Sequence, residues 1–176
     1  MKILVITPQY APDFGPSAPI YTGLCEDLAK MGCEVTVVTA FPNYTGLGRS
    51  VPHGMKLIEE EQLNGVRILR TYIYAVPKSS LWKRLLYHAS FNIFATLAAL
   101  RTKKTDIIIA DAPVLWSGLP LIIKALIPRT AYIYVVHDIY PDILVRLNML
   151  HNPFIIHLID RIERFYYQHA LQISVL

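Results

Sequence analysis

The chain has 176 residues, which is enough for one domain with a substantial buried core. Hydrophobic residues make up 53% of the chain and charged residues 17%, so the composition argues against a disordered protein. The formal net charge of +4 is unevenly distributed, because residues 62–105 contain eight Lys and Arg residues and no Asp or Glu. A stretch of one sign favours an anionic partner such as a phosphate ligand, a nucleic acid or an acidic membrane.

The cysteines and the start of the chain bear on the cellular compartment. Cys25 and Cys33 have no metal-binding spacing and are typical of buried thiols in a reducing compartment. The apolar run Ile3–Ile6 is too short for the core of a secretory signal, and Thr7 and Pro8 end it. The sequence therefore predicts a cytoplasmic protein.

The first elements in the chain are a strand, a helix and a second strand. The apolar run of residues 3–6 predicts a buried strand, and the run Val35–Thr39 predicts a parallel neighbour. Between them lies a helix that Ser17 is placed to cap, with Pro19 in its first turn and Gly32 just beyond its end. The apolar stripe of this helix consists of Tyr21, Leu24, Cys25 and Leu28.

Strands and helices alternate through the rest of the chain. Residues 56–62 and 66–72 predict two strands around Asn64-Gly65, a dipeptide that favours a hairpin, and the acidic residues 59–61 place this hairpin at the sheet edge. The remaining predicted elements are a helix over 81–101, a strand over 106–110, a broken helix over 115–127, a strand over 131–136, a helix beginning at Asn152-Pro153 and a strand over 171–176. The apolar face of the last helix is predicted to be Ile155, Leu158, Ile159, Ile162, Phe165 and Tyr166. The order predicts an α/β fold, a doubly wound and mostly parallel sheet with an edge hairpin.

The loop before the first helix is the first candidate for a binding site. Gly15 permits close backbone approach or a positive φ, and the helix start behind it offers free N–H groups to a phosphate. An ordinary strand-to-helix loop is the alternative, because the dinucleotide-binding motif G-x-G-x-x-G is absent.

A second candidate lies where the predicted strand over 131–136 ends. His137 and Asp138 follow this strand at its carboxyl end, where open α/β sheets place their ligand sites. A histidine there is able to donate a hydrogen bond or to move a proton near neutral pH. The alternative is a structural histidine that is hydrogen-bonded to a neighbouring loop.

The predicted helix over 81–101 is the third candidate, as a surface that contacts a membrane. Its apolar residues are interrupted too often for a membrane span, but basic residues stand at both ends and aromatic residues near the start, as in helices that lie in a membrane interface. The residues expected to contact the membrane are Lys78, Trp82, Lys83, Arg84, Lys103 and Lys104. The alternatives are a helix packed on the sheet with solvated flanks, and a nucleic-acid surface. The latter is disfavoured because the basic residues bracket an apolar helix and do not alternate with exposed stacking aromatics.

Four segments resemble, in their order and spacing, the N-terminal domain of GT-B glycosyltransferases. The chain is most similar to the retaining family four and, within it, to bacterial enzymes of surface-polysaccharide assembly of the colanic-acid type. The segments are Met1–Pro16, Phe41–Tyr44, Asn64–Ile68 and Val136–Asp142. The resemblance covers essentially the whole chain and is specific for the family, not for the sugar.

The resemblance implies half of a two-domain enzyme. Residues 1–176 would be the N-terminal, acceptor-side, Rossmann-like domain, and a C-terminal nucleotide-sugar domain with a pair of glutamates would be absent from this chain. Such a fragment is not expected to turn over alone. A strand that ends the chain at 171–176 also fits a natural terminus.

The resemblance also assigns roles to residues at matching positions. It places the donor diphosphate at Gly15, Pro16 and Ser17. It gives His137 a contact with the transferred sugar and gives Asp138 the orientation of its loop. The residues expected to contact the acceptor are Tyr10, Asn43 and Tyr44.

The implied partners are a nucleoside diphosphate sugar and a lipid-linked or saccharide acceptor, with no nucleic acid. The enzyme is expected to need no metal and no cofactor, and to be cytoplasmic or peripheral on the inner face of the plasma membrane. The alternative function is a stand-alone nucleotide- or phosphate-binding module without catalysis.

Overall fold

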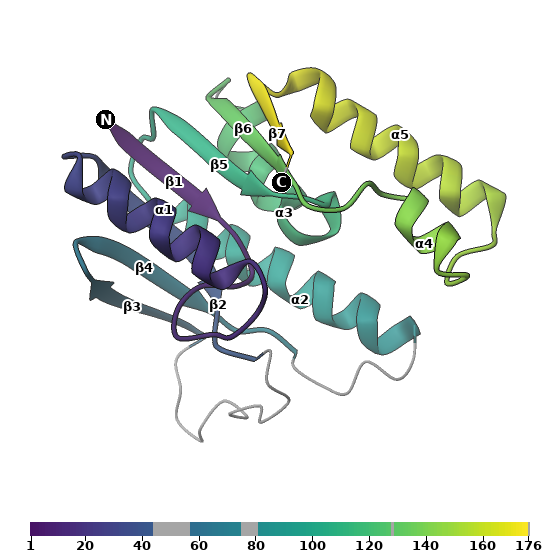
Figure 1. Cartoon of the computed structure of the whole chain (residues 1–176), viewed down its shortest axis with the longest axis horizontal. Helices are drawn as coiled ribbons and strands as arrows, with labels where there is room; N and C mark the ends of the chain where they lie inside the picture. Colours follow the sequence, from purple (N-terminus) through teal and green to yellow (C-terminus); the bar gives the residue numbers. More distant parts are fainter. Residues whose placement is uncertain (44–56, 75–80, 128, 176) are drawn as a thin grey trace.

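The computed structural model describes residues 1–43, 57–74, 81–127 and 129–175, and in these ranges the side chains of residues 81, 84 and 126 are not described. The described residues form a central sheet with helices on both faces (Figure 1). The predicted α/β class, a doubly wound and mostly parallel Rossmann-like sheet with an edge hairpin, is confirmed.

The sheet has seven strands in the order β3-β4-β2-β1-β5-β6-β7. The strands are β1 Lys2–Ile6, β2 Glu34–Ala40, β3 Ile58–Leu63, β4 Val66–Thr71, β5 Ile107–Asp111, β6 Ala131–Val136 and β7 Gln172–Val175. Neighbouring strands pair in parallel except β3 and β4, which form the antiparallel hairpin at one edge. The chain leaves β1 toward β2 and later returns to β5 on the other side of β1. The topological switch point therefore lies between β1 and β5.

The helices cover the two faces of the sheet unequally. They are α1 Ala18–Lys30, α2 Leu81–Leu100, α3 Val114–Leu121, α4 Asp142–Arg146 and α5 Pro153–His169, with a π-helical turn η1, Ile122–Leu126, after α3. Helix α1 packs on one face, where its Tyr21 and Cys25 join a core with Ile3 and Val5. Residues of α2, α3 and α5 join the core on the other face, because right-handed crossovers in the opposite direction along the sheet bring their helices to that side.

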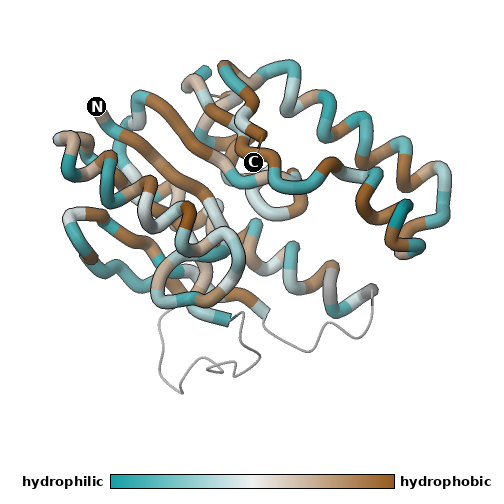
Figure 2. Tube along the Cα trace, in the orientation of Figure 1, coloured by the Kyte–Doolittle hydropathy of each residue, from teal (hydrophilic) through white to brown (hydrophobic). Residues whose placement is uncertain are grey.

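The central strands are apolar on both faces, which explains their uninterrupted hydrophobic runs. Side chains alternate along β1, so Ile3 and Val5 enter the core under α1 whereas Leu4 and Ile6 enter the core under α2 and α3. Figure 2 shows the resulting band of hydrophobic residues along β1 and β5.

The structure differs from the sequence prediction in four local features. Strand β5 includes Asp111, one residue beyond the predicted end, and the short helix α4 was not predicted. The helix predicted over 115–127 is α3 followed by a π-helical turn, with Pro120 inside α3. Ser17 is the N-cap residue of α1, but its side chain makes no capping hydrogen bond within the helix.

Helix α5 buries a different face from the predicted one. Tyr166 is buried as expected, but Phe165 is 43% exposed and Glu163 is only 1% exposed. The Glu163 carboxylate accepts hydrogen bonds from the Val114 backbone N–H at 2.7 Å and from the Tyr134 hydroxyl at 3.1 Å. The start of α3 thus gains a carboxylate partner for one of its free N–H groups, which explains how a charged residue takes a core position. The other predicted apolar residues that are exposed are Ile155, Leu158 and Ile162.

The acid-free stretch of the sequence is not free of acids in space. Glu60 of β3 forms an ion pair with Arg67 of β4 at 2.7 Å, and Glu61 accepts a hydrogen bond from Arg70 at 2.7 Å. The hairpin brings these acids beside two of the eight basic residues of this stretch.

Candidate functional site

The candidate site lies at the carboxyl ends of β1, β5 and β6. Thr7 follows β1, Asp111 is the last residue of β5 and His137 follows β6. The parallel register pairs Ile6 with Ala110 and Asp111 with Val135, so the three strand ends lie side by side. This edge includes the switch point between β1 and β5, where open α/β sheets form a ligand crevice.

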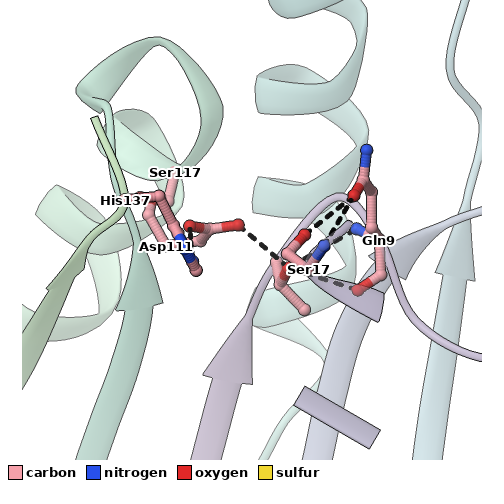
Figure 3. Close-up of polar contacts among 6 residues, drawn as sticks. Gln9, Ser17, Asp111, Ser117 and His137 are labelled. Atoms are coloured by element: carbon pink, nitrogen blue, oxygen red, sulfur yellow. Dashed lines mark hydrogen bonds and ion pairs between the residues drawn. The ribbon is translucent and has the colours of Figure 1, made fainter. Parts of the chain in front are cut away.

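Asp111 links these strand ends through its buried carboxylate (Figure 3). The residue is 4% exposed. Its Oδ2 accepts a hydrogen bond from the Thr7 hydroxyl at 3.1 Å, and its Oδ1 lies 3.3 Å from His137 Nε2. Burial raises the pKa of Asp111 to about 7, and the hydroxyls of Thr7 and Tyr21 oppose this shift. The carboxyl group therefore titrates near neutral pH, in the range useful for proton transfer.

His137 lies against both Asp111 and helix α1. Its ring meets the Tyr21 ring edge-on, with centroids 6.0 Å apart. Burial lowers the pKa of His137, and the neighbouring Asp138 acts in the opposite direction. The side chain of His137 is 25% exposed although Nε2 is buried, so the exposed surface belongs to the rest of the ring. Asp138 itself is exposed.

The start of α1 interacts with the side chain of Gln9. Gln9 Oε1 accepts hydrogen bonds from the Ser17 backbone N–H at 3.3 Å and from the Ser17 hydroxyl at 2.8 Å. A Cβ on Gly15 would lie 2.1 Å from the same oxygen. Close approach to the Gln9 amide thus requires a glycine at position 15, and φ of this residue is not in the left-handed region. The amide oxygen occupies the place that an anion oxygen takes at a helix start.

Partly buried polar contacts hold the loop that precedes α1. The guanidinium of Arg70 donates to the Ala11 carbonyl oxygen as well as to Glu61. Asp13 Oδ2 accepts a hydrogen bond from the Asn43 backbone N–H at 3.2 Å. The Asn43 side-chain oxygen in turn accepts one from the Tyr87 hydroxyl at 2.8 Å. Asn43 therefore lies at the carboxyl edge of the sheet, beside the loop that precedes α1.

Of the other residues expected to contact the acceptor, one requires a correction. Tyr10 is 1% exposed and lies in the core under α1, and burial raises the pKa of its hydroxyl. A residue so enclosed has no surface with which to contact an acceptor. Tyr44 lies outside the described residues.

A surface hollow adjoins the loop at the start of α1. Its volume is about 660 Å³, and its lining includes Phe14, Gly15, Pro16 and Pro19. Another hollow, of about 630 Å³, lies at the amino ends of β6 and β7 and contains none of the predicted site residues.

The residues expected to contact a membrane are divided between the two ends of α2. Trp82 is 76% exposed and Lys83 is exposed at the start of the helix, whereas Lys103 and Lys104 are exposed just after its end. A helix of 20 residues separates the two groups by about 30 Å. Lys78 and the side chain of Arg84 lie outside the part of the chain that the structure describes.

The described part of the chain has neither a membrane-spanning helix nor a metal-binding cluster. No described helix is both long and apolar enough to cross a membrane. No group of three or more His, Cys, Asp or Glu side chains is placed to bind a metal ion among the residues that the structure describes.

Sequence reasoning missed four residues of this site. They are Thr7, Gln9, Tyr21 and Asp111. Asp111 carried a usable signal, because it follows the apolar run 107–110 just as His137 follows the run 131–136. The contact between Gln9 and Ser17 had no such signal, because it depends on the path of the loop.

The doubly wound sheet, with polar residues gathered at its switch point, defines a Rossmann-like ligand-binding domain. Residues 17–176 match the family described as "Glycosyl transferase 4-like domain". The chain belongs to this family, as the resemblance in its sequence indicated.

A curated relative also matches the chain. Over 135 residues it is 34% identical to the "Putative colanic acid biosynthesis glycosyl transferase WcaI" of Escherichia coli strain K12. The match covers 74% of this chain and 33% of that protein. The chain thus spans about a third of the length of the curated relative that it matches.

Proposed function

We propose that this chain is the acceptor-binding half of a glycosyltransferase that moves a sugar from a nucleoside diphosphate sugar to a lipid-linked or polysaccharide acceptor. Family membership supports sugar transfer, and the name of the relative supports an acceptor in polysaccharide assembly. The observation that carries the proposal is the set of polar contacts at the switch point. They join Asp111 to His137 and to the Thr7 hydroxyl, whose oxygen also accepts the Gln9 backbone N–H at 3.4 Å.

The donor diphosphate is assigned to Gly15, Pro16 and Ser17. The free N–H groups at the start of α1 and the positive end of the helix dipole favour a departing diphosphate. In the structure the Gln9 amide oxygen accepts the hydrogen bonds of Ser17. A phosphate oxygen is the stronger acceptor, since hydrogen bonds to charged groups are about twice as strong as neutral ones. We therefore expect the donor to displace the Gln9 amide.

His137 is assigned to the transferred sugar and Asp138 to the orientation of its loop. Sugar transfer passes through a state with oxocarbenium character, in which charge separates between the ring and the diphosphate. A ring nitrogen at the edge of the sheet is well placed to hold a sugar hydroxyl while the helix start holds the diphosphate. Fixing both parts of the donor in one geometry lowers the entropic barrier to transfer.

A lipid-linked acceptor would require the domain to meet a membrane surface. Helix α2 exposes large apolar side chains along its length, with Trp82 and Lys83 at one end and Lys103 and Lys104 at the other. Apolar contact and attraction to anionic lipid act together in interfacial helices. We assign α2 this role on the inner face of the plasma membrane.

The decisive test is a transfer assay in which the complete two-domain enzyme that carries this half is given a panel of nucleoside diphosphate sugars and a polyprenyl diphosphate-linked acceptor. We expect one donor to be used and His137→Ala to lower kcat by at least about 100-fold. The matched control is His157→Ala, because His157 is exposed on α5. Normal turnover by His137→Ala would remove His137 from the site, and a failure of every donor would refute the proposed reaction.

A further inference from the structure

We infer that Asp111 is the residue that positions His137 and fixes its tautomer, so that the free ring nitrogen accepts a hydrogen bond from a hydroxyl of the substrate. The observation is the contact of 3.3 Å between Asp111 Oδ1 and His137 Nε2. Both atoms are buried, and among the described residues neither meets hydrogen-bond geometry with any partner, so the two are in close polar contact and each has the other available to satisfy it. The inference deepens the proposed function and rests on it for the identity of the substrate.

The carboxylate is held from several directions. Asp111 Oδ2 accepts a hydrogen bond from the Thr7 hydroxyl at 3.1 Å. The backbone carbonyl oxygen of Asp111 accepts one from the Ser117 hydroxyl at 2.6 Å. Thr7 belongs to the β1 end and Ser117 to α3, so two elements fix the position of Asp111. An imidazole that meets a carboxylate held in this way loses rotational freedom about its own side-chain bonds.

The groups around Asp111 and His137 indicate that a single proton is shared between the two facing atoms, Asp111 Oδ1 and His137 Nε2. Those facing the pair are Tyr21 from α1, Thr7 after β1 and Asp138 in the loop after β6. No cation of the described residues other than His137 itself lies among these neighbours. Burial raises the pKa of Asp111 and lowers that of His137, so both groups resist a charge of their own. Above neutral pH the arrangement that satisfies both facing atoms is an ionised Asp111 and a neutral His137 with its proton on Nε2.

This tautomer has a chemical consequence for substrate binding. A neutral imidazole with a proton on Nε2 carries a lone pair on Nδ1 and is an acceptor there. A sugar hydroxyl is a donor of matching polarity, whereas a carbonyl oxygen or a phosphate oxygen is not. Asp111 therefore makes His137 selective for a hydroxyl group and keeps it from competing with the helix start for the diphosphate.

The test is a titration of the His137 ring by nitrogen and carbon NMR in the protein labelled at histidine. At pH 8 we expect the Nε2–H tautomer in the wild-type protein. In Asp111→Asn we expect a substantial part of the ring to change to the Nδ1–H tautomer at pH 8, because the variant loses the carboxylate that faces Nε2. The matched control is Asp138→Asn, which also removes one negative charge next to His137 but no contact to Nε2, and its effect should be smaller.

Two outcomes would overturn the inference. One is a wild-type ring with its proton on Nδ1 at pH 8. The other is an Asp111→Asn variant whose ring keeps the wild-type tautomer at pH 8 or changes no further than in Asp138→Asn. Should Asp111→Asn fail to fold, Thr7→Val tests the same geometry by removing the donor to Oδ2, and an unaltered tautomer at pH 8 would count against the inference. The NMR result does not depend on sugar transfer, so it separates this inference from the proposed function.

Discussion

Because Gly15 lies so close to Gln9, Gly15→Ala is predicted to lower the free energy of unfolding of the wild-type protein but to raise it in a variant that lacks the Gln9 side chain. A Cβ at position 15 would lie 2.1 Å from Gln9 Oε1, so Gly15→Ala must expel the Gln9 amide. The amide then loses its two hydrogen bonds to Ser17. Each is worth about 0.5 to 1.5 kcal/mol, so the loss is about 1 to 3 kcal/mol.

The expected net effect is smaller, because replacing a glycine also restricts the unfolded chain. Where the backbone conformation suits alanine, this gain is about 0.4 to 1 kcal/mol, and φ of Gly15 is outside the left-handed region. Gly15→Ala alone should therefore destabilise the protein by up to about 2.5 kcal/mol, with a central value of about 1 kcal/mol. With Gln9→Ala in the background, the same change should stabilise it by up to about 1 kcal/mol.

The assay is urea-induced unfolding of the two single variants, the double variant and the wild type, compared as a double-mutant cycle. A matched control is Gly23→Ala, because a Cβ at this position in α1 would meet no atom within 4 Å. That control should be stabilising in both backgrounds. The reasoning fails if Gly15→Ala has the same cost with and without the Gln9 side chain.

Two further predictions concern charge. The pKa of Asp111 in the folded protein is raised from 3.8 to about 7, so the folded state binds more protons than the unfolded state between these values and stability is lost as the pH rises through them. Asp111→Asn has no such carboxyl group and should not lose stability in this way. The difference in free energy of unfolding, variant minus wild type, should therefore rise between pH 4 and pH 8, by at most about 4 kcal/mol. A difference that stays constant with pH would refute the buried-charge argument. Reversing the charges of Lys83, Lys103 and Lys104 should weaken binding to anionic vesicles at low salt but not to neutral vesicles. Equal binding by the variant to anionic vesicles in a sedimentation assay would argue against electrostatic docking.

The sequence was sufficient for the fold because the decisive signals are local. Uninterrupted apolar runs marked the buried parallel strands, and Asn64-Gly65 marked the hairpin. The Asn152 cap of α5 was also visible, and its side chain accepts hydrogen bonds from the backbone N–H groups of Phe154 and Ile155. These features depend on neighbours within a few residues, so the order of residue types is enough to find them.

The candidate site was only partly predictable, because its contacts join distant segments. The rule about strand ends located His137 and would have located Asp111, but their pairing depends on the register of β5 against β6. Tyr10 also lies shortly after a strand end, but the path of the loop after β1 directs its side chain into the core under α1. The burial of Glu163 could not be predicted for the same reason, since its partner Val114 lies 49 residues away.

The reach of Arg70 has a consequence for distant changes. One guanidinium spans from Glu61 on the outermost strand to the backbone of Ala11, in the segment that leads to the start of α1. The edge of the sheet thus supports the turn that precedes α1. Substitutions in the outer strand, even far from any ligand, would therefore first increase the mobility of the segment that leads to α1. Only larger disruptions would lower the stability of the whole fold.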